Sequence, residues 1–232
     1  LPTASINRAP YYIYSLTESP VPGIGDVTFV PSNSQEAMTW EESLSKNYTD
    51  GIIVLHKGDV VYERYRGCLT PHTNHAAMSM TKSITGLLAE ILIANGQLDE
   101  TQPVKNIVPE LAQSAFGDAT VRQVMDMTTS LDYSELYSDP NADIWQYSYA
   151  ANPLPKPDAY KGPVGYFEYL QGVKKLGDHG TAFGYKTVNS DVLGWVLSRV
   201  SGKKYNQLAS ELLWQNIGAA FSADITVDGL GT

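Results

Sequence analysis

The chain has little of three things that would settle its class directly: cysteine, basic residues and long apolar runs. Only Cys68 is a cysteine among 232 residues, so no intrachain disulfide can form, and disulfides say nothing about the compartment. Sixteen basic residues stand against 25 acidic ones, and the net charge of −9 argues against non-specific binding to nucleic acid or to anionic membranes. No apolar run reaches the ~18–20 residues of a membrane span. The localisation stays open.

Patterns typical of metal sites and reactive thiols are also missing. The four histidines include one close pair, His72 and His75, which lies in a predicted loop without the spacing of a ligand set. Cys68 could be a nucleophile with these histidines nearby, but its loop setting lacks the helix start that activates a thiolate. We therefore expect no metal and no cofactor. The remaining composition, 43% hydrophobic and 18% charged, is that of a globular protein of one large domain or a domain with an inserted lobe.

The stretch 78–95 is the one around which the chain is organised. From Ile84 onward it is nearly all apolar without a polar stripe, which predicts a helix buried on most sides. Gly96 is a natural helix stop in the left-handed conformation. The polar residues gather at the start, where Ser79 and Lys82 are three apart and share a face of the first turn.

A hydroxyl and an amine at a helix start form a specific chemical pair. A serine hydroxyl is a poor nucleophile until a base takes its proton. An amine can be that base when it is neutral, and both desolvation and the positive end of a helix favour the neutral form. The N–H of Ser79 can also serve as one donor to an oxyanion. The spacing therefore makes Ser79 a candidate nucleophile and Lys82 its candidate base.

The same spacing also arises by chance about once in a chain of this length. Two further copies are present, Ser43 with Lys46 and Ser201 with Lys204. The first lies in a polar run typical of a solvated helix face, and the second at a helix end, where cations are favoured. Only the middle copy opens an apolar helix, and a partly exposed helix start remains the alternative to a nucleophile there.

The other expected elements follow from caps and alternation. The best hairpin is 51–57 with 59–66, joined by a turn at Gly58. Asn33 with Glu36, and Thr120 with Gln123, resemble capping boxes. Asn189 or Ser190 is expected to cap a later helix. The expected helices are 34–47, 78–95, 120–127, 165–175, 191–200 and 205–217, with a strand at 224–227.

A long irregular region is expected over residues 128–161. It carries six aromatic residues and two proline-marked turns. Loops of this length in compact domains are often functional, and the aromatic content indicates that the region lines a pocket. An aromatic-packed surface loop is the alternative.

Several separated segments resemble the serine β-lactamase and penicillin-binding-protein superfamily. They are residues 78–83, 126–133 and 183–195, with 200–202 and 224–228 behind them, in matching order and spacing over about residues 50–230. Within the superfamily the chain looks closest to the 6-aminohexanoate-dimer (nylon-oligomer) hydrolases and the class C-like esterases. The resemblance implies an α/β, β-lactamase-like fold: an antiparallel sheet flanked by helices, plus a mostly helical lobe.

The resemblance also implies roles for individual residues. Ser79 matches the acylated nucleophile, Lys82 its base partner, and Tyr185 the tyrosine that relays the proton to the leaving group. Tyr137 matches a loop tyrosine that contacts the substrate amide. The remaining substrate-binding candidates are Asn189, which alternatively caps the following helix, and Tyr133 at the end of the second segment.

One family segment has no counterpart in the chain. Nothing after Tyr185 matches the short Lys- or His-containing strand that supplies the second oxyanion N–H, a donor whose loss typically costs ~10²–10³-fold in rate. We therefore expect residues 1–232 to be the N-terminal portion of one catalytic domain that lacks its C-terminal strands. Its expected parts are an extended arm (1–33), a first helix and hairpin (34–78) and a mostly helical lobe (79–232).

The sequence thus predicts a serine hydrolase that cleaves small linear amides or esters through an acyl-enzyme. A β-lactamase or D,D-peptidase is the alternative within the same chemistry, and a catalytically silent scaffold or binding protein is the alternative outside it. The expected partners are a small-molecule substrate and a C-terminal remainder of the same polypeptide. The oligomeric state stays open.

Overall fold

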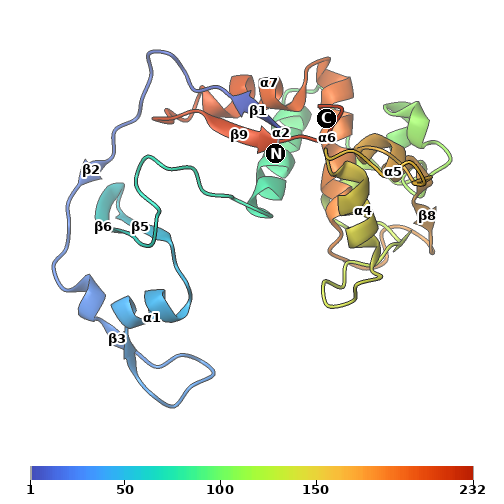
Figure 1. Ribbon diagram of the computed structural model, residues 1–232. Coiled ribbons are helices and arrows are strands. Elements are labelled where there is room, and N and C mark those ends of the chain that lie inside the picture. The colour runs from blue at the N-terminus through green and yellow to red at the C-terminus, as the bar shows by residue number, and fades with distance from the viewer. Residues whose placement is uncertain (1, 232) are drawn as a thin grey trace. The chain divides into compact units, whose positions relative to one another are not determined.

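The computed structural model describes residues 2–231 and divides into two compact units (Figure 1). The smaller unit is Tyr14–Ala77, and the larger one holds the rest of the described chain. The expected division at residues 33 and 78 stays a prediction, and the expected strands beyond Thr232 lie outside the described residues.

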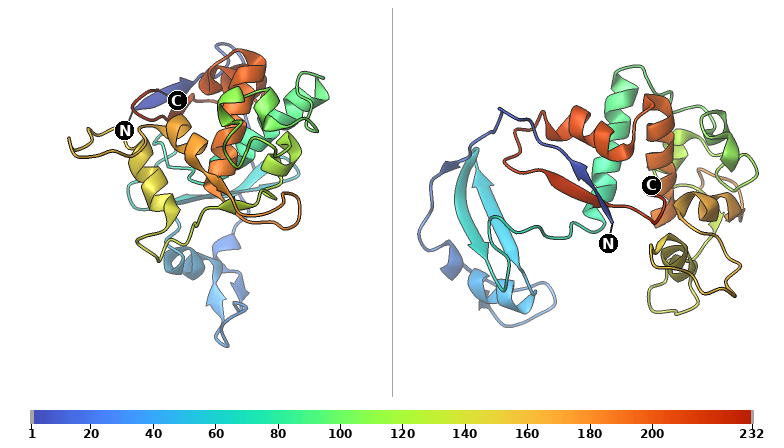
Figure 2. Two further views of the ribbon diagram at one scale, coloured as in Figure 1. Left: turned by 90° about the vertical axis from the view of Figure 1, so that its right-hand side faces the viewer. Right: turned by 45° about the horizontal axis from the view of Figure 1, so that its top comes forward.

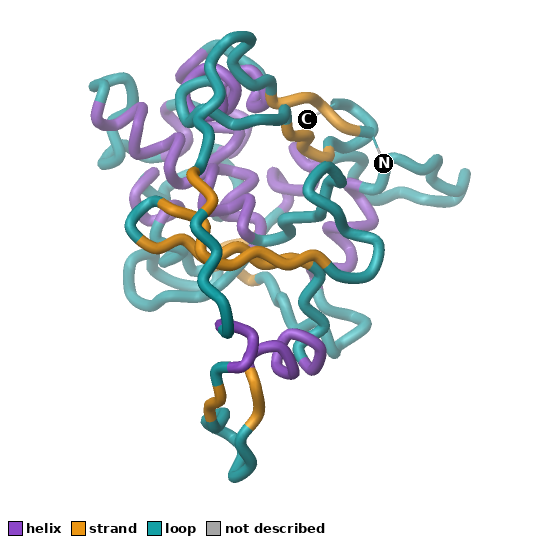
Figure 3. Tube along the Cα trace, turned by 90° about the vertical axis from the view of Figure 1, so that its left-hand side faces the viewer, coloured by secondary structure: helices purple, strands orange, loops and turns teal. Residues whose placement is uncertain are grey.

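The smaller unit is organised around the predicted hairpin, which is confirmed as β5 (Gly51–His56) and β6 (Asp59–Tyr65) (Figure 3). Lys57 and Gly58 both have positive φ, as a tight hairpin turn requires. A short strand, β2 (Thr17–Glu18), pairs with β6 in parallel. The remaining elements of this unit are η1 (Ile24–Asp26), β3 (Thr28–Phe29), β4 (Met38–Thr39) and α1 (Trp40–Lys46).

The prediction of a helix starting near residue 34 is wrong. Helix α1 begins at Trp40, and its capping box is formed by Thr39 and Glu42. The predicted pair, Asn33 and Glu36, does not cap it. The later box is used because it precedes the turn that buries Ser43 and Leu44.

The larger unit is mostly helical, with one antiparallel strand pair that joins segments distant in sequence. Strand β1 (Thr3–Ile6) pairs with β9 (Ala223–Thr226) beside α2 and α7 (Figure 2). The expected strand at 224–227 is thereby confirmed within one residue. The other elements of this unit are α2 (Met80–Ala94), η2 (Val104–Asn106), η3 (Pro109–Leu111), α3 (Val121–Met125), β7 (Leu131–Asp132), α4 (Asp143–Ala151), α5 (Tyr166–Gly172), β8 (Lys174–Lys175), α6 (Thr187–Ser201), α7 (Tyr205–Ala209) and η4 (Ser210–Trp214).

Three further expectations need correction. The region 128–161 is not irregular throughout, because it contains α4. Neither Asn189 nor Ser190 is a helix cap, because α6 begins at Thr187 and encloses both. The expected helix 205–217 is two shorter elements, α7 and the π-helical turn η4.

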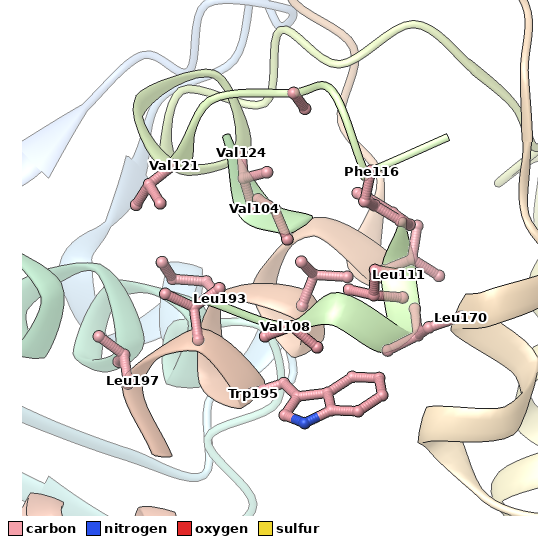
Figure 4. Close-up of a cluster of buried hydrophobic side chains, with 14 of the residues drawn as sticks. Val104, Val108, Leu111, Phe116, Val121, Val124, Leu170, Leu193, Trp195 and Leu197 are labelled. Atoms are coloured by element: carbon pink, nitrogen blue, oxygen red, sulfur yellow. The ribbon is translucent and has the colours of Figure 1, made fainter. Parts of the chain in front are cut away.

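Helix α2 ends as predicted, with Gly96 at a φ of 69° just after it. It is buried along one stripe and not on most sides: Leu88, Ala89 and Leu92 are buried, whereas Leu87 is 44% exposed. This stripe belongs to one apolar core that also contains residues of η2, η3, α3 and α6 (Figure 4). Because α2 and α6 pack against each other, the segments that lead into these two helices are held close together.

We expect Leu88→Ala to lower the free energy of unfolding by about 2–5 kcal/mol, because Leu88 is completely buried and the truncation leaves a cavity. Leu87→Ala is the matched control on the same helix turn and should change stability by less than about 1 kcal/mol. Urea denaturation of both variants checks this, and equal losses would contradict the described orientation of α2.

Candidate active site

The start of α2 brings the predicted serine and lysine together. Ser79 occupies the N-cap position, yet its side chain does not cap the helix. Instead, Ser79 Oγ accepts a hydrogen bond from Lys82 Nζ at 3.1 Å. Ser79 is exposed and Lys82 is half-buried, so the hydroxyl is open to an incoming molecule while the amine lies partly against the protein.

The other two Ser-x-x-Lys copies do not form such a pair. Ser43 Oγ donates to the Trp40 carbonyl at 2.6 Å, and Ser201 Oγ donates to the Leu197 carbonyl at 2.7 Å. Both hydroxyls are therefore bound to the backbone of their own helix, a common local bond for serine. Among the described residues, Ser79 is the one serine of the three whose hydroxyl contacts its lysine.

Tyr185 completes the group that the sequence predicted. Lys82 Nζ lies 5.2 Å from the centroid of the Tyr185 ring, a cation–π distance, and the tyrosine is 43% exposed. The segment carrying it is anchored on both sides: the Gly184 N–H donates to the Met127 carbonyl at 2.9 Å, and Lys186 Nζ donates to the Leu131 carbonyl at 2.7 Å. These bonds hold the Tyr185 ring at the α2 start.

Tyr137 is tied to the same group through a carboxylate that the sequence did not single out. Glu135 accepts a bond from the Tyr137 hydroxyl at 2.7 Å, and from both the N–H and the hydroxyl of Thr187 at 2.5 Å. The hydrogen bond to Glu135 raises the pKa of the Tyr137 phenol, with burial and the charge of Glu135 adding to the effect. Glu135 therefore links the Tyr137 loop to the first turn of α6, two residues after Tyr185.

The other two substrate-binding candidates are buried. Asn189 is fully buried inside α6, where its carbonyl oxygen accepts from Thr129 Oγ1 at 2.6 Å and its amide donates to the Lys186 carbonyl at 3.3 Å. Tyr133 is 6% exposed, and this burial raises the pKa of its phenol. Substrate contact by these two residues stays a prediction, and in this conformation the Asn189 side chain reaches no solvent.

Asp191 is a second residue that sequence reasoning missed. Its carboxylate accepts a hydrogen bond from the Tyr147 hydroxyl of α4 at 2.7 Å. Burial raises the pKa of the Asp191 carboxyl to about 6, while the Tyr147 hydrogen bond and the charge of Lys82 act in the opposite direction. Asp191 directly precedes the apolar run 192–197, which was the available signal, whereas Glu135 lies in a loop and carried none.

We expect Asp191→Asn to remove a pH dependence of stability. The pKa of the Asp191 carboxyl is higher in the folded protein than in the unfolded chain. As the pH rises from about 4 to above 6, the unfolded chain therefore loses this proton first, and the free energy of unfolding falls. A pKa difference of about two between the folded and unfolded states corresponds to at most about 3 kcal/mol in the free energy of unfolding. The Asp191→Asn variant should therefore gain stability over the wild type at about pH 8 and not at about pH 4.

Urea denaturation at both pH values measures this gain. Asp158→Asn, at an exposed loop position, is the control and should show no such pH-dependent gain. An Asp191→Asn gain that is the same at both pH values would contradict a perturbed carboxyl.

The family model named Beta-lactamase matches residues 42–220, which includes the α2 start, the Glu135 loop and α6. The chain belongs to the beta-lactamase family. Its mixed α/β architecture is accordingly a β-lactamase-like fold, as the sequence predicted.

Two relatives of this beta-lactamase family member cover nearly the whole chain. The 6-aminohexanoate-dimer hydrolase of Paenarthrobacter ureafaciens is 34% identical over 232 residues, which are 100% of this chain and 56% of that protein. A solved Bacillus anthracis protein assigned as a 6-aminohexanoate-dimer hydrolase has a TM-score of 0.90 at 27% identity, covering 99% of this chain and 60% of that one. The chain thus spans somewhat more than half the length of these relatives.

A second solved structure shows the fold alone. EstCE1, a hydrolase with promiscuous acyltransferase activity, has a TM-score of 0.54 at 18% identity and covers 81% of this chain and 57% of its own.

Two classes of feature are not found in the described part of this beta-lactamase family member. Residues 2–231 contain no group of three or more His, Cys, Asp or Glu side chains placed to hold a metal ion. No helix in that range is long and apolar enough to cross a membrane.

Proposed function

We propose that the protein is a serine hydrolase that cleaves small linear amides or esters through an acyl-enzyme on Ser79. The observation that carries the proposal is the 3.1 Å contact between Lys82 Nζ and Ser79 Oγ, with the Tyr185 ring beside the amine. A hydroxyl within hydrogen-bond reach of a base, and a second proton-carrying group next to that base, are the requirements of nucleophilic acyl transfer.

The proposed reaction begins with Lys82 Nζ taking the Ser79 proton as Oγ attacks the substrate carbonyl. The negative charge that develops on the carbonyl oxygen is bound by the N–H of Ser79 as one oxyanion donor. Tyr185 passes a proton to the leaving amine or alcohol, and the carbonyl–heteroatom bond breaks to leave an ester on Ser79. Water then attacks this ester with the proton transfers reversed, which releases the acid and restores the hydroxyl.

The substrate class is supported by the relatives and by the Tyr137 loop. Two proteins that match nearly all of this chain are assigned as 6-aminohexanoate-dimer hydrolases, and such a dimer is a small linear amide. Tyr137 is 57% exposed, and its hydroxyl is fixed by Glu135, so it can contact the amide of a bound substrate.

A fluorophosphonate probe tests the nucleophile. We expect one adduct, located on the peptide that contains Ser79 by mass spectrometry, and none on Ser79→Ala. The control variant Ser43→Ala, which changes another Ser-x-x-Lys copy, should label like the wild type. Failure of the wild-type protein to label would favour a catalytically silent scaffold.

Turnover of three substrates tests the substrate class. We expect hydrolysis of a p-nitrophenyl ester and of the 6-aminohexanoate dimer at higher kcat/KM than that of nitrocefin. A preference for nitrocefin would contradict the linear-substrate proposal and would indicate a β-lactamase.

A further inference from the structure

His179 is the one histidine in the larger unit, and its imidazole is buried between segments that are distant in sequence. The side chain is 4% exposed. Its Nδ1 accepts a hydrogen bond from the Ser130 N–H at 2.9 Å, 49 residues away. Its Nε2 lies 2.9 Å from the Ala115 carbonyl oxygen, 64 residues away, and 3.2 Å from Asp118 Oδ1. The imidazole therefore bridges two other parts of the chain.

These contacts fix the protonation state of the ring. A backbone N–H can only donate a hydrogen bond, so Nδ1 is the unprotonated nitrogen that accepts from Ser130. A carbonyl oxygen and an ionised carboxylate can only accept, so Nε2 carries the hydrogen. The hydrogen bond from Lys175 is the main cause that lowers the pKa of the Asp118 carboxyl, which keeps this carboxylate an acceptor. His179 is therefore held as the neutral tautomer with its hydrogen on Nε2.

The Ala115 end of this bridge is fixed in the core. Ala115 is 3% exposed and belongs to the apolar core of the larger unit. Its N–H donates to the Val173 carbonyl at 2.8 Å, and the neighbouring Phe116 is completely buried. Close-packed interiors yield little to displacement. The Ala115 carbonyl is thus a rigid point to which the imidazole is tied.

The other end of the bridge holds the strip of chain that positions the proposed proton donor. The segment 180–186 runs beside residues 127–131, and the Gly180 N–H donates to the Thr128 carbonyl at 2.8 Å. Two further bonds of this segment to the same residues, described above, lie on either side of its tyrosine. His179 directly precedes the segment and binds a backbone N–H within 127–131. The imidazole therefore fixes both pieces of chain that place the tyrosine.

The Tyr185 ring depends on this backbone for its position. Its hydroxyl has no hydrogen-bond partner among the described residues, and the residue is 43% exposed. The contact that the proposed reaction needs is the one to Lys82, whose Nζ lies 5.2 Å from the ring centroid. A displacement of the phenol by about 1 Å can cost on the order of 10²-fold in rate, even when its cause lies far from the reacting atoms.

We propose that the His179 imidazole is a positioning group for Tyr185. Held between Ala115 and Ser130, it keeps the backbone that carries the tyrosine in place. The inference rests on the proposed function, because it concerns the step in which the tyrosine protonates the leaving group. Loss of the bridge slows that step and leaves substrate binding and the attack by Ser79 intact.

The ratio of amide to ester turnover tests this role. His179→Leu removes both bonds and should lower kcat on the p-nitroanilide of hexanoic acid by about tenfold or more relative to kcat on the p-nitrophenyl ester, with KM unchanged within about twofold. His179→Asn keeps an acceptor at the place of Nδ1, because both atoms are bonded to Cγ, and should lower the ratio by only about threefold. Fluorophosphonate labelling counts the active sites, so each kcat is expressed per folded enzyme.

His56→Asn is the control for these variants. His56 is exposed on β5 in the smaller unit, and its replacement should leave the ratio unchanged. Equal losses of anilide and ester turnover in both His179 variants would show an effect on the fold alone and would overturn the proposal.

The bridge itself can be observed in the wild-type protein without any substrate. Nitrogen chemical shifts in NMR spectra distinguish a protonated ring nitrogen from an unprotonated one. At about pH 8, the signals that disappear in His179→Asn should be those of a neutral imidazole with its hydrogen on Nε2. A hydrogen on Nδ1 would overturn the proposal, because the bond from Ser130 could not then form.

The two proposals fail in different ways. Absence of fluorophosphonate labelling in the wild type would refute the hydrolase and, with it, the role of His179 in that reaction. Labelling at Ser79 together with an unchanged amide-to-ester ratio in both His179 variants would leave the hydrolase in place and refute the positioning role.

Discussion

Lys82→Ala should lower kcat/KM for a p-nitrophenyl ester by about 10²–10⁴-fold, the range that a positioned general base contributes. Nothing else among the described side chains donates to or accepts from Ser79 Oγ in the structure, so the hydroxyl would lose its proton acceptor. Steady-state hydrolysis and the rate of fluorophosphonate labelling should fall together, because both require the same attack by Ser79.

Two further variants test whether Lys82 acts as a base. Lys82→Arg keeps a positive charge but cannot act as a base, so it should lose activity as Lys82→Ala does. Lys46→Ala changes another Ser-x-x-Lys copy, in which Ser43 is bound to the Trp40 carbonyl, and should keep wild-type activity. An active Lys82→Arg variant would show that charge at this position, and not proton transfer, is what matters.

Tyr185→Phe should have the second-largest effect, a loss of about 10²–10³-fold in kcat for substrates with poor leaving groups such as amides. The reason is that an amine leaves only when protonated, and the variant removes the phenol proposed to supply the proton. A p-nitrophenyl ester has a good leaving group and should lose much less. The measurement is the ratio of kcat values on an anilide and on the matching ester.

Tyr149→Phe is the matched control for this variant. Tyr149 is 39% exposed, close to the 43% of Tyr185, and it lies on α4 away from the α2 start. It should leave the amide-to-ester ratio unchanged. Equal losses of Tyr185→Phe on both substrates would contradict a role in leaving-group protonation and would point to a role in binding.

The central helix and the hairpin could be predicted because their signals are local. Helix α2 is a long apolar run ended by Gly96, and β5–β6 is an alternating pair around Gly58. Helix α4 was missed because it is nine residues long and lies between proline-marked turns, although its buried residues Ile144, Tyr147 and Ala151 have helical spacing. The α1 start was misplaced because two similar capping boxes compete, and only burial of Leu44 decides between them.

The candidate site likewise has one part that local sequence signals predict and another part that depends on contacts between distant residues. The Ser79–Lys82 pair follows from spacing within one helix turn, whereas Tyr185 was indicated only by resemblance to a family. Glu135 and Asp191 depend on contacts made by folding: Glu135 binds Thr187, 52 residues away, and Asp191 binds Tyr147, 44 residues away. A single sequence does not show such pairings, because it does not reveal which distant residue each carboxylate contacts.

Capture of the acyl-enzyme tests the central claim most directly. The protein is mixed with a p-nitrophenyl ester, quenched in acid during turnover, and digested for mass spectrometry. The account predicts that the acyl mass appears on the peptide containing Ser79, is absent in Ser79→Ala, and accumulates more slowly in Lys82→Ala. Turnover without any acyl mass on that peptide would contradict it.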